Sequence, residues 1–246
     1  MRCLDLTLST PAENLAGDEA LLAWCEEGMH APILRFWEPQ EHFVVLGYAN
    51  RVSQEIRADL GCDSLPGIYR RCSGGGSVVQ GPGCLNYALI LKAEAGGALG
   101  GIASANRFIM EKHREVLQNL LNESERRGPR RVTVEGHTDL AVDGLKCSGN
   151  AQRRARNWLL FHGTFLLHLD LREIERLLMQ PARQPPYRNQ RTHREFLVNL
   201  ELPAEHLKQA LRHAWSALEP MADWPREETQ RLARDKYETN AWNLKF

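Results

Sequence analysis

The chain has 246 residues and carries 31 lysine and arginine side chains against 31 aspartate and glutamate side chains, so its formal net charge is zero. That balance argues against a nucleic-acid-binding protein, which would normally show a basic excess. No run of about 18 apolar residues is present, so no membrane span is predicted.

The N-terminus and the cysteines predict a cytoplasmic protein. Asp5 stands where a signal peptide would have its apolar core, which argues against export. The six cysteines form no CxxC pair and show no regular spacing, so they fit neither a zinc site nor a disulfide framework. Reduced thiols are the simplest interpretation. These cysteines are Cys3, Cys25, Cys62, Cys72, Cys84 and Cys147.

Helices and short strands are mixed along the chain. The patterns predict a helix over 11–29, paired strands over 33–37 and 43–47, a short helix over 53–60, and strands over 68–71 and 85–91. They then predict a helix over 105–122, a hairpin over 138–149, a strand over 158–167, and helices over 171–178, 203–219 and 226–236. The polar stretch 181–194 fits a loop that orders on binding and a disordered connection equally well. The mixture predicts an α+β domain with a largely antiparallel sheet.

The first candidate site is the stretch RRCSGGGSVV at residues 70–79. Consecutive glycines let the backbone approach a ligand closely, because no Cβ stands in the way. Their N–H groups form a concavity that suits an anion, and the arginines beside them add planar charged groups. A flexible surface turn with basic neighbours is the alternative, and this stretch alone does not separate the two.

Lys146 is the second candidate. It follows the predicted hairpin turn and precedes a segment of small residues, where a lysine can act as a fixed point charge on a phosphate or carboxylate. Taken alone, an exposed hairpin lysine is the simpler interpretation. A neighbouring cation would activate Cys147 as a nucleophile, but consecutive strand residues face opposite sides, so the two cannot share one pocket unless the strand has a bulge. We expect Cys147 to be a packing residue.

Three further residues have two interpretations each. His162 either lines a pocket or is hydrogen-bonded in the core, and Gly163 marks a bulge or a close ligand approach. Asp139 either binds a cation or caps a turn. No HExxH, GxSxG, P-loop or Rossmann motif is present, which argues against the commonest hydrolase, kinase-like and dinucleotide-binding folds.

Five segments, in order, resemble the lipoate–protein ligase family, which includes lipoyl- and octanoyltransferases and is related to biotin–protein ligases. RRCSGGGSV at 70–78 is similar to the family loop RRxSGGGxV, and TDLAVDGLKCSGNA at 138–151 is similar to NDLxVxGxKxSGxA. VVLG at 44–47 resembles the family strand before the loop, HGTFLL at 162–167 its HGTLLL strand, and residues 237–243 its closing Trp-Asn motif. The resemblance covers nearly the whole chain.

The resemblance implies one α+β catalytic domain of the biotin/lipoate–protein ligase (class II synthetase-like) type over residues 1–246, without a C-terminal accessory domain. Either a separate accessory subunit supplies that domain, or the protein performs only the transfer step. The implied partners are lipoate or octanoate and a lipoyl carrier domain protein, with no nucleic acid and no membrane.

The activity that the resemblance implies is that of an ATP-dependent lipoate–protein ligase. Lipoate and ATP would form lipoyl-AMP with loss of pyrophosphate, and a lysine of the carrier domain would then attack the acyl carbonyl. Magnesium is expected with ATP because hard phosphate oxygens prefer it. Both reactants are anions, so adenylation needs fixed cations to bring them together.

The family pattern also implies roles for single residues. Lys146 would be the catalytic residue, and Asp139 is a candidate metal ligand. The implied ATP or AMP contacts are Arg71, Gly76, Ser77, Val78, Val79 and Lys146. The implied lipoate contacts are Arg71, Gly75, His162, Gly163 and Lys146.

Two segments depart from the family pattern. The family often continues the loop as Val-(Phe/Tyr)-His-Asp, whereas this chain has VQGP at 79–82. The family strand usually continues as Gly-x-x-Gln-Asn, whereas this chain reads GYAN at 47–50. The first departure removes two polar or ionisable side chains where the loop would meet its substrate.

Two other functions stay open. An ATP-independent transferase would move octanoyl or lipoyl groups between carrier proteins with a cysteine nucleophile, but residues 131–137, where one subgroup places it, contain no cysteine. Unless Cys147 or Cys84 has taken that role, the ligase is the preferred hypothesis. A non-catalytic binder of lipoate or of a lipoylated carrier is the third possibility, and it predicts that Lys146→Ala leaves ligand affinity nearly unchanged.

Overall fold

The computed structural model describes residues 1–28, 31–57, 66–123 and 130–246. Eight of the described strands form one large sheet, in which β1 lies parallel to both its neighbours and the other pairs are antiparallel. This arrangement confirms the predicted α+β class with a largely antiparallel sheet. In sheet order the strands are β11 (Glu219–Pro220), β1 (Arg2–Asp5), β2 (Ile33–Trp37), β6 (Cys84–Lys92), β10 (Trp158–Leu166), β9 (Leu145–Arg154), β8 (Asp139–Val142) and β7 (Val132–Glu135).

A second, small sheet contains β4 (Gly67–Arg70), β3 (Phe43–Leu46) and β5 (Val78–Gln80), in that order. The predicted pairing of 33–37 with 43–47 is therefore wrong. β2 lies between β1 and β6 in the large sheet, whereas β3 pairs with β4 and β5. All the residues of β2 and β3 are buried, so each strand needs neighbours on both edges and cover on both faces.

The helices follow the predicted pattern with different ends. The predicted helix 203–219 stops at Ala214, and residues 58–60 of the predicted helix 53–60 lie outside the described ranges. Within those ranges, no helix combines the length and apolar character that crossing a bilayer requires. The helices are α1 (Pro11–Glu27), α2 (Val52–Glu55), α3 (Ile102–Glu123), α4 (Leu171–Leu177), α5 (His193–Phe196), α6 (Ala204–Ala214), α7 (Arg226–Leu232) and α8 (Asn240–Asn243), with a 3-10 turn at Pro186–Arg188 and a π turn at Ala233–Tyr237.

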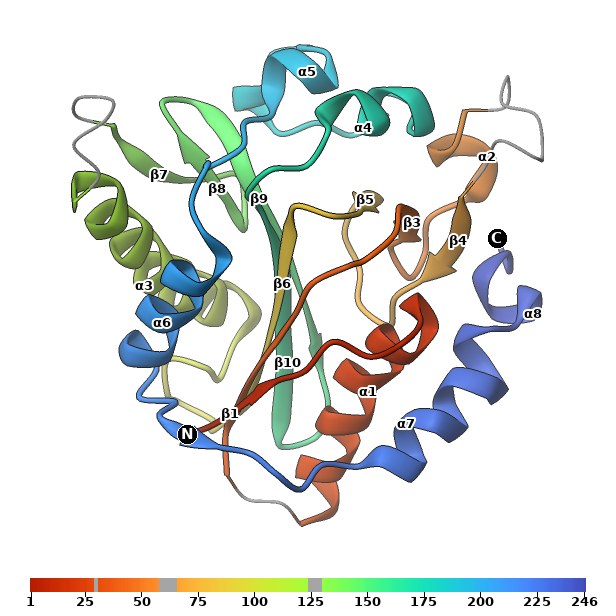
Figure 1. The fold of residues 1–246 in the computed structure, drawn as a ribbon, viewed down its shortest axis with the longest axis vertical. Coiled ribbons are helices and arrows are strands. Elements are labelled where there is room, and N and C mark those ends of the chain that lie inside the picture. Colours follow the sequence, from red (N-terminus) through yellow and green to blue (C-terminus); the bar gives the residue numbers. More distant parts are fainter. Residues whose placement is uncertain (29–30, 58–65, 124–129) are drawn as a thin grey trace.

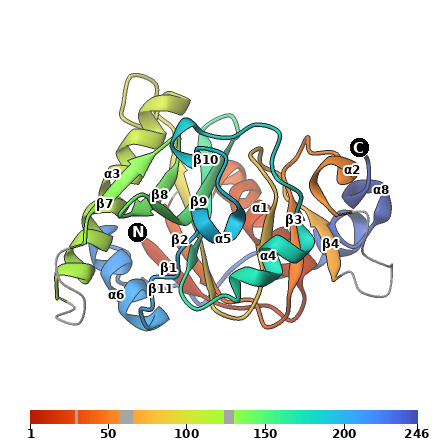
Figure 2. The ribbon, with the colours of Figure 1, turned by 90° about the horizontal axis from the view of Figure 1, so that it is seen from above.

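Helices cover both faces of the large sheet, because side chains alternate across each strand. On one face α3 and α6 pack over a core that includes Leu89 and Phe161. On the other face α1 packs over Ala88 and Leu160, with α7 beside it (Figure 1). The small sheet, α2 and α8 lie at one end of the molecule, and α3 with β7 lies at the other (Figure 2).

Helix α1 begins with a capping box. The Thr10 hydroxyl accepts from Glu13 N, and the Glu13 carboxylate accepts from Thr10 N, both at 3.1 Å. Such an N-cap is worth about 1 kcal/mol. Gly28, with a φ of 141°, ends the helix. The helix places Asp18, which is 2% exposed, at the interface with the large sheet.

Candidate functional site

The glycine loop, residues 73–77, connects the two outer strands of the small sheet and presents its three glycines to solvent. Gly75 has a φ of 91°, in the left-handed region that favours glycine. Tyr48 N donates to Ser73 O at 2.8 Å. A Cβ on Gly47 would overlap the carbonyl oxygen of Gly75, so the turn after β3 packs directly against this loop.

Arg71 holds the glycine loop from the inside. Its Nη2 donates to Gly74 O at 2.6 Å and to Gly76 O at 2.8 Å, and its Nε donates to Ser73 Oγ at 3.1 Å. The side chain is buried, and burial lowers the pKa of its guanidinium to about 10. These contacts assign Arg71 to the shape of the loop, whereas the sequence had suggested a direct contact with a phosphate.

Arg70 is also committed to the fold. It is fully buried, and its guanidinium donates to the carbonyl oxygens of Gly47, Asn50 and Asn243 at 2.7–2.9 Å. It thereby ties the last helix to the turn after β3. Although the two arginines are adjacent in sequence, neither projects into solvent as a free anion contact.

The glycine loop nevertheless has backbone hydrogen-bond donors available for a ligand. Among the described residues, the backbone N–H groups of Gly74, Gly75 and Gly76 have no hydrogen-bond partner. Arg71 holds two of the loop carbonyls inward. Successive unpaired N–H groups form an anion-binding concavity, which suits an oxyanion as well as a phosphate. This supports the anion-site interpretation of the stretch.

Lys146 forms the charged part of the site. Its Nζ lies 2.8 Å from Asp139 Oδ1, and the two side chains are 26% and 15% exposed. Tyr187 O–H donates to Asp139 Oδ2 at 2.8 Å, so both carboxylate oxygens have partners. A Cβ on Gly149 would lie 3.1 Å from Lys146 Nζ. The lysine therefore extends over Gly149, held by one acid but still reachable from solvent.

The strand that carries Lys146 contains a bulge. Ala141 pairs with Lys146 and Leu140 pairs with Ser148, so Cys147 is the extra residue. Cys147 is fully buried, its Sγ lies 3.3 Å from Leu140 O, and burial raises the pKa of its thiol to about 12. The expected packing role agrees with this geometry. Cys147 and Lys146 do not share a pocket.

Lys146 and the glycine loop lie over the same face of β9. A Cβ on Gly75 would lie 3.8 Å from the Cβ of Ala151, and Lys146 extends over Gly149. Residues 149 and 151 are about 7 Å apart on one side of the strand, because side chains alternate. The ammonium group and the glycine loop thus lie at two ends of a floor of small residues, Gly149 and Ala151.

His162 lies beside this floor, opposite Ala151 on β10. It is 8% exposed, its Nε2 lies 2.6 Å from Ser73 Oγ, and its Nδ1 lies 3.0 Å from Asp18 Oδ2. Arg35 Nη1 donates to the other oxygen of Asp18 at 2.6 Å. Of the two interpretations of His162, the structure supports the hydrogen-bonded core histidine, attached to the rear of the glycine loop.

Of the two interpretations of Gly163, the structure tests the bulge. It pairs with Tyr87 on one side and Asn150 on the other without a register shift, so it marks no bulge. A Cβ there would overlap Asn150 Oδ1, which also accepts from Tyr87 O–H at 2.7 Å. The Asn150 side chain fills the space that the glycine leaves, and the contact of Gly163 with lipoate stays a prediction.

The residues after the glycines turn into the interior. Val79 packs inside, whereas Ser77 Oγ is buried and has no hydrogen-bond partner among the described residues. Val78 is half-buried. Gln80, at the first departure from the family pattern, exchanges hydrogen bonds of 2.9 Å with Asn86 and donates to Thr164 at 2.7 Å. The departure thus adds a buried polar cluster next to the floor.

Five cysteines lie in the described ranges, and all are buried. Burial raises the pKa of Cys84 to about 12 and that of Cys72 to about 11. Cys62 lies outside the described residues. Neither Cys84 nor Cys147 has the exposed, low-pKa character of a catalytic thiol.

Asp139 has the wrong surroundings for a metal ligand. Both of its oxygens are engaged, one by an ammonium group and one by a phenol. In the described part of the chain, no group of three or more His, Cys, Asp or Glu side chains could hold a metal ion. The geometry favours the ion-pair role, in which Asp139 orients Lys146.

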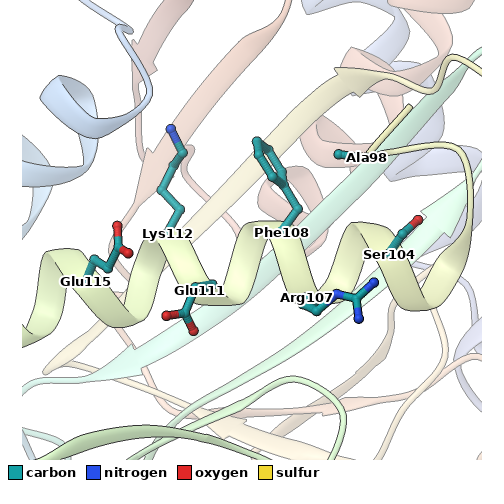
Figure 3. A pocket seen from close by; sticks show the side chains of 7 residues that line it. All are labelled: Ala98, Ser104, Arg107, Phe108, Glu111, Lys112 and Glu115. Carbon is teal, nitrogen blue, oxygen red and sulfur yellow. The ribbon is translucent and has the colours of Figure 1, made fainter. Parts of the chain in front are cut away.

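A separate surface groove of about 430 Å³ runs along α3, with Phe108 at its centre and Glu111 and Lys112 at its edge (Figure 3). It lies on the α3 side of the large sheet, whereas the glycine loop lies on the α1 side. The groove is therefore not part of the candidate site.

Several residues of the site were absent from the sequence interpretation. Asp18 lies in the first helix, Ser73 lies in the glycine loop, and Tyr187 lies in the polar stretch 181–194. That stretch is ordered and packs on the hairpin, with Arg191 donating to Gly144 O at 3.1 Å. No local pattern distinguishes these residues, because each is brought to the site by contacts distant in sequence.

Comparison with known proteins gives a consistent family. The model of the lipoyl protein ligase A/B catalytic domain matches residues 10–214. Octanoyltransferase LipM of Halalkalibacterium halodurans is 28% identical over 99% of this chain and 98% of that protein, and the LipM of Bacillus subtilis is 27% identical with the same coverage. Among solved structures, a bi-partite lipoate protein ligase from Thermoplasma acidophilum, studied with its E2 lipoyl domain, has a TM-score of 0.76 at 22% identity and covers 99% of this chain and 96% of that one.

These relatives correct the expected reaction. Both sequence relatives are named octanoyltransferases, and a transferase receives an acyl group that is already activated. The ATP-dependent, adenylate-forming lipoate–protein ligase is therefore wrong, and so are ATP and Mg²⁺ as its cofactors. Because ATP is no longer an expected cofactor, the ATP or AMP contacts implied for residues 76–79 have no ligand. The resemblance itself is confirmed, because the family includes octanoyltransferases.

Proposed function

The chain belongs to the lipoyl protein ligase A/B catalytic-domain family, and we propose on that basis that it transfers an octanoyl or lipoyl group from a thioester to a lysine of a lipoyl carrier domain. The names of the sequence relatives support the transfer and the octanoyl group. The neighbour studied with its E2 lipoyl domain supports the kind of acceptor.

The reaction needs no nucleotide. The uncharged ε-amine of the acceptor lysine attacks the carbonyl carbon of the thioester, so that a C–N bond forms and the C–S bond breaks. The proton of the amine leaves with the thiolate as a thiol. During the attack, negative charge develops on the carbonyl oxygen, and stabilising that charge is the main task of the enzyme.

The position of Lys146 is the observation that carries the proposal. Its ammonium group is fixed by Asp139 at 2.8 Å and lies over Gly149, on the same face of β9 as the glycine loop with its unpaired N–H groups. A carbonyl oxygen placed over this floor would meet a cation on one side and N–H donors on the other. That arrangement suits an oxyanion that forms during acyl transfer.

The buried thiols favour direct transfer to the acceptor amine. Cys84 and Cys147 have raised pKa values, and desolvation in the core is the main cause in both. A thiolate is the nucleophilic form of cysteine, so neither residue suits an acyl-enzyme intermediate. We therefore include a single attack by the carrier lysine in the proposal.

Lys146 variants test this function. Octanoyl-coenzyme A serves as the thioester probe and an isolated lipoyl domain as the acceptor, and intact mass spectrometry follows octanoyl-lysine formation without ATP. Removing one oxyanion-stabilising group typically costs about 10²–10³-fold in rate. Lys146→Ala is expected to lose transfer by that order, and Lys146→Arg, which keeps the charge, is expected to lose less.

Lys92→Ala is the matched control. Lys92 also pairs with an acid, Glu94 at 3.2 Å, but it lies at the far end of β6 and is exposed. Its transfer rate should equal that of the unaltered protein. If Lys146→Ala transferred octanoyl as fast as this control, the role of Lys146 would be refuted. A protein that bound the acceptor without modifying it would support the non-catalytic binder instead.

A further inference from the structure

A chain of hydrogen bonds runs from the first helix to the glycine loop. Asp18 on α1 lies 3.0 Å from His162 Nδ1 on β10, and His162 Nε2 lies 2.6 Å from Ser73 Oγ. Three elements distant in sequence therefore converge on one line of polar atoms. The exposed fractions of Asp18, His162 and Ser73 are 2%, 8% and 2%, so water does not satisfy these groups.

The surroundings of a neutral His162 ring select one of its two tautomers. Asp18 is held by Arg35, whose Nη1 donates to Oδ1 at 2.6 Å, so Asp18 acts as an acceptor. A neutral His162 then carries its proton on Nδ1 to donate to Asp18, which leaves Nε2 as an acceptor for the Ser73 hydroxyl. Ser73 Oγ in turn accepts from Arg71 Nε at 3.1 Å. Every member of the chain is satisfied in this arrangement.

Arg71, at the end of this series of hydrogen bonds, shapes the candidate oxyanion site. Arg71 receives its position partly from Ser73 and donates to the carbonyl oxygens of Gly74 and Gly76. Each of those oxygens shares a peptide plane with the next N–H group, so holding them inward fixes the direction of the N–H groups of Gly75 and Ser77. The N–H groups of Gly74–Gly76 remain without partners in the described structure and are free to face a ligand.

We propose that Asp18, His162 and Ser73 are positioning residues that set the conformation of the glycine loop through Arg71, and so aim its N–H groups at the acyl carbonyl oxygen. This inference rests on the proposed acyl transfer for the identity of the ligand. The hydrogen-bonded series Asp18–His162–Ser73–Arg71, called the relay below, is a property of the free protein. It can therefore be tested without substrate.

The same geometry is found in enzymes with a serine nucleophile, where serine, histidine and aspartate are linked in this order. Two observations assign Ser73 to positioning. It is almost fully buried, and its Oγ is already engaged by both His162 and Arg71. A nucleophilic Ser73 would form an ester with the octanoyl group, which intact mass spectrometry of the enzyme detects.

The tautomer of His162 is the first test. In ¹⁵N-histidine-labelled protein, two-bond ¹H–¹⁵N correlation spectra distinguish a proton on Nδ1 from one on Nε2, and His162→Gln identifies the resonance. The relay predicts a neutral ring with its proton on Nδ1. In Asp18→Asn, Arg35 retains the amide oxygen, so the amide nitrogen faces His162 and the proton moves to Nε2. An Nε2–H tautomer in the unaltered protein would overturn the relay, whether or not the protein transfers octanoyl.

Ser73 variants provide the second test and do not disturb the buried pair of Asp18 and Arg35. Ser73→Ala is expected to lower kcat for octanoyl transfer about 10–100-fold, the order expected for a small misplacement of catalytic groups, with KM changed less than about 3-fold. Ser73→Thr keeps the hydroxyl and is expected to recover most of the rate.

Thr229→Val is the control, because it removes a hydroxyl that is 1% exposed and bonded to Pro225 O, on α7. It should leave kcat unchanged. Three results would overturn the positioning role: an unchanged kcat in Ser73→Ala, no recovery in Ser73→Thr, or an octanoyl ester on Ser73. Absence of any transfer by the unaltered protein would refute the proposed function, while the His162 tautomer would still decide whether the relay exists.

Discussion

Lys146 and Asp139 form an ion pair of 2.8 Å across two neighbouring strands of the hairpin, and the lysine side chain remains 26% exposed. A partly exposed pair of this kind contributes at most about 1 kcal/mol to stability. The main effect of the pair is therefore to orient the side chain of Lys146. It keeps one ammonium group over Gly149, where it can meet an incoming carbonyl oxygen.

Tyr187 should influence the reaction through Asp139. Tyr187→Phe removes the O–H that donates to Asp139 Oδ2 at 2.8 Å, so the carboxylate gains freedom to rotate and Lys146 is held less firmly. We expect kcat for octanoyl transfer to fall about 3–10-fold and the free energy of unfolding to fall by about 1 kcal/mol. Steady-state kinetics and urea unfolding measure the two effects.

Tyr48→Phe is the control for this prediction, because Tyr48 is exposed and its hydroxyl has no hydrogen bond in the described structure. An equal loss of kcat in both variants would show that the effect does not pass through Asp139.

The buried cysteines should be dispensable for transfer. Cys84→Ala and Cys147→Ala are expected to transfer octanoyl at rates within about 2-fold of the unaltered protein, because neither thiol is available as a thiolate at neutral pH. Each variant should lose on the order of 1 kcal/mol of stability from the missing sulfur. If either variant lost transfer while its circular dichroism spectrum stayed unchanged, direct attack by the carrier lysine would be contradicted.

Gly163 should matter for the stability of the fold. In Gly163→Ala the added methyl group overlaps Asn150 Oδ1, and overpacking of this kind costs about 1–3 kcal/mol. Adding Asn150→Ala should restore part of that stability, because the overlap is with this side chain. Gly74→Ala is the control, since a Cβ there would meet nothing within 4 Å. Equal unfolding free energies for Gly163→Ala and Gly74→Ala would contradict the structure at this position.

Acid should destabilise the protein through His113. This residue is 1% exposed, and burial, with Lys112 nearby, lowers its pKa from 6.5 to about 3. The unfolded chain binds the proton below its ordinary pKa and the folded chain does not, so stability is complete above pH 6.5 and is lost as the pH falls toward 3. The slope from this group approaches about 1.4 kcal/mol per pH unit.

His113→Phe should reduce that slope in urea unfolding measured from pH 7 to pH 4. At pH 7 the variant should be less stable, because Trp215 Nε1 loses the acceptor that lies 2.9 Å away. His206→Gln changes an exposed histidine and should leave the slope unaltered. An identical pH dependence in His113→Phe would contradict a neutral, buried His113.

Local sequence patterns predicted the features that depend on neighbouring residues. The turn at Asp143 and Gly144 has positive φ values of 52° and 78°, as the Asp-Gly pair indicates for a two-residue hairpin. The glycine loop and Lys146 were recognised because their chemistry is visible in a few consecutive residues. The family followed from the order of these segments along the chain.

The patterns did not predict features that depend on distant contacts. Asp18 reaches His162 across 144 positions, and Tyr187 reaches Asp139 across 48. Arg71 was expected to face a ligand, but the loop carbonyls fold back onto its guanidinium. The chemistry was also misjudged, because a loop with unpaired N–H groups and a fixed lysine suits an acyl oxyanion as well as a nucleotide phosphate.

The ATP requirement of octanoyl-lysine formation tests the central claim most directly. The protein and a lipoyl domain are incubated either with octanoyl-coenzyme A alone or with octanoate, ATP and Mg²⁺, and the mass of the lipoyl domain is followed over time. Transfer is predicted in the first mixture and none in the second. Modification only in the mixture with ATP would contradict the account and identify an adenylating ligase.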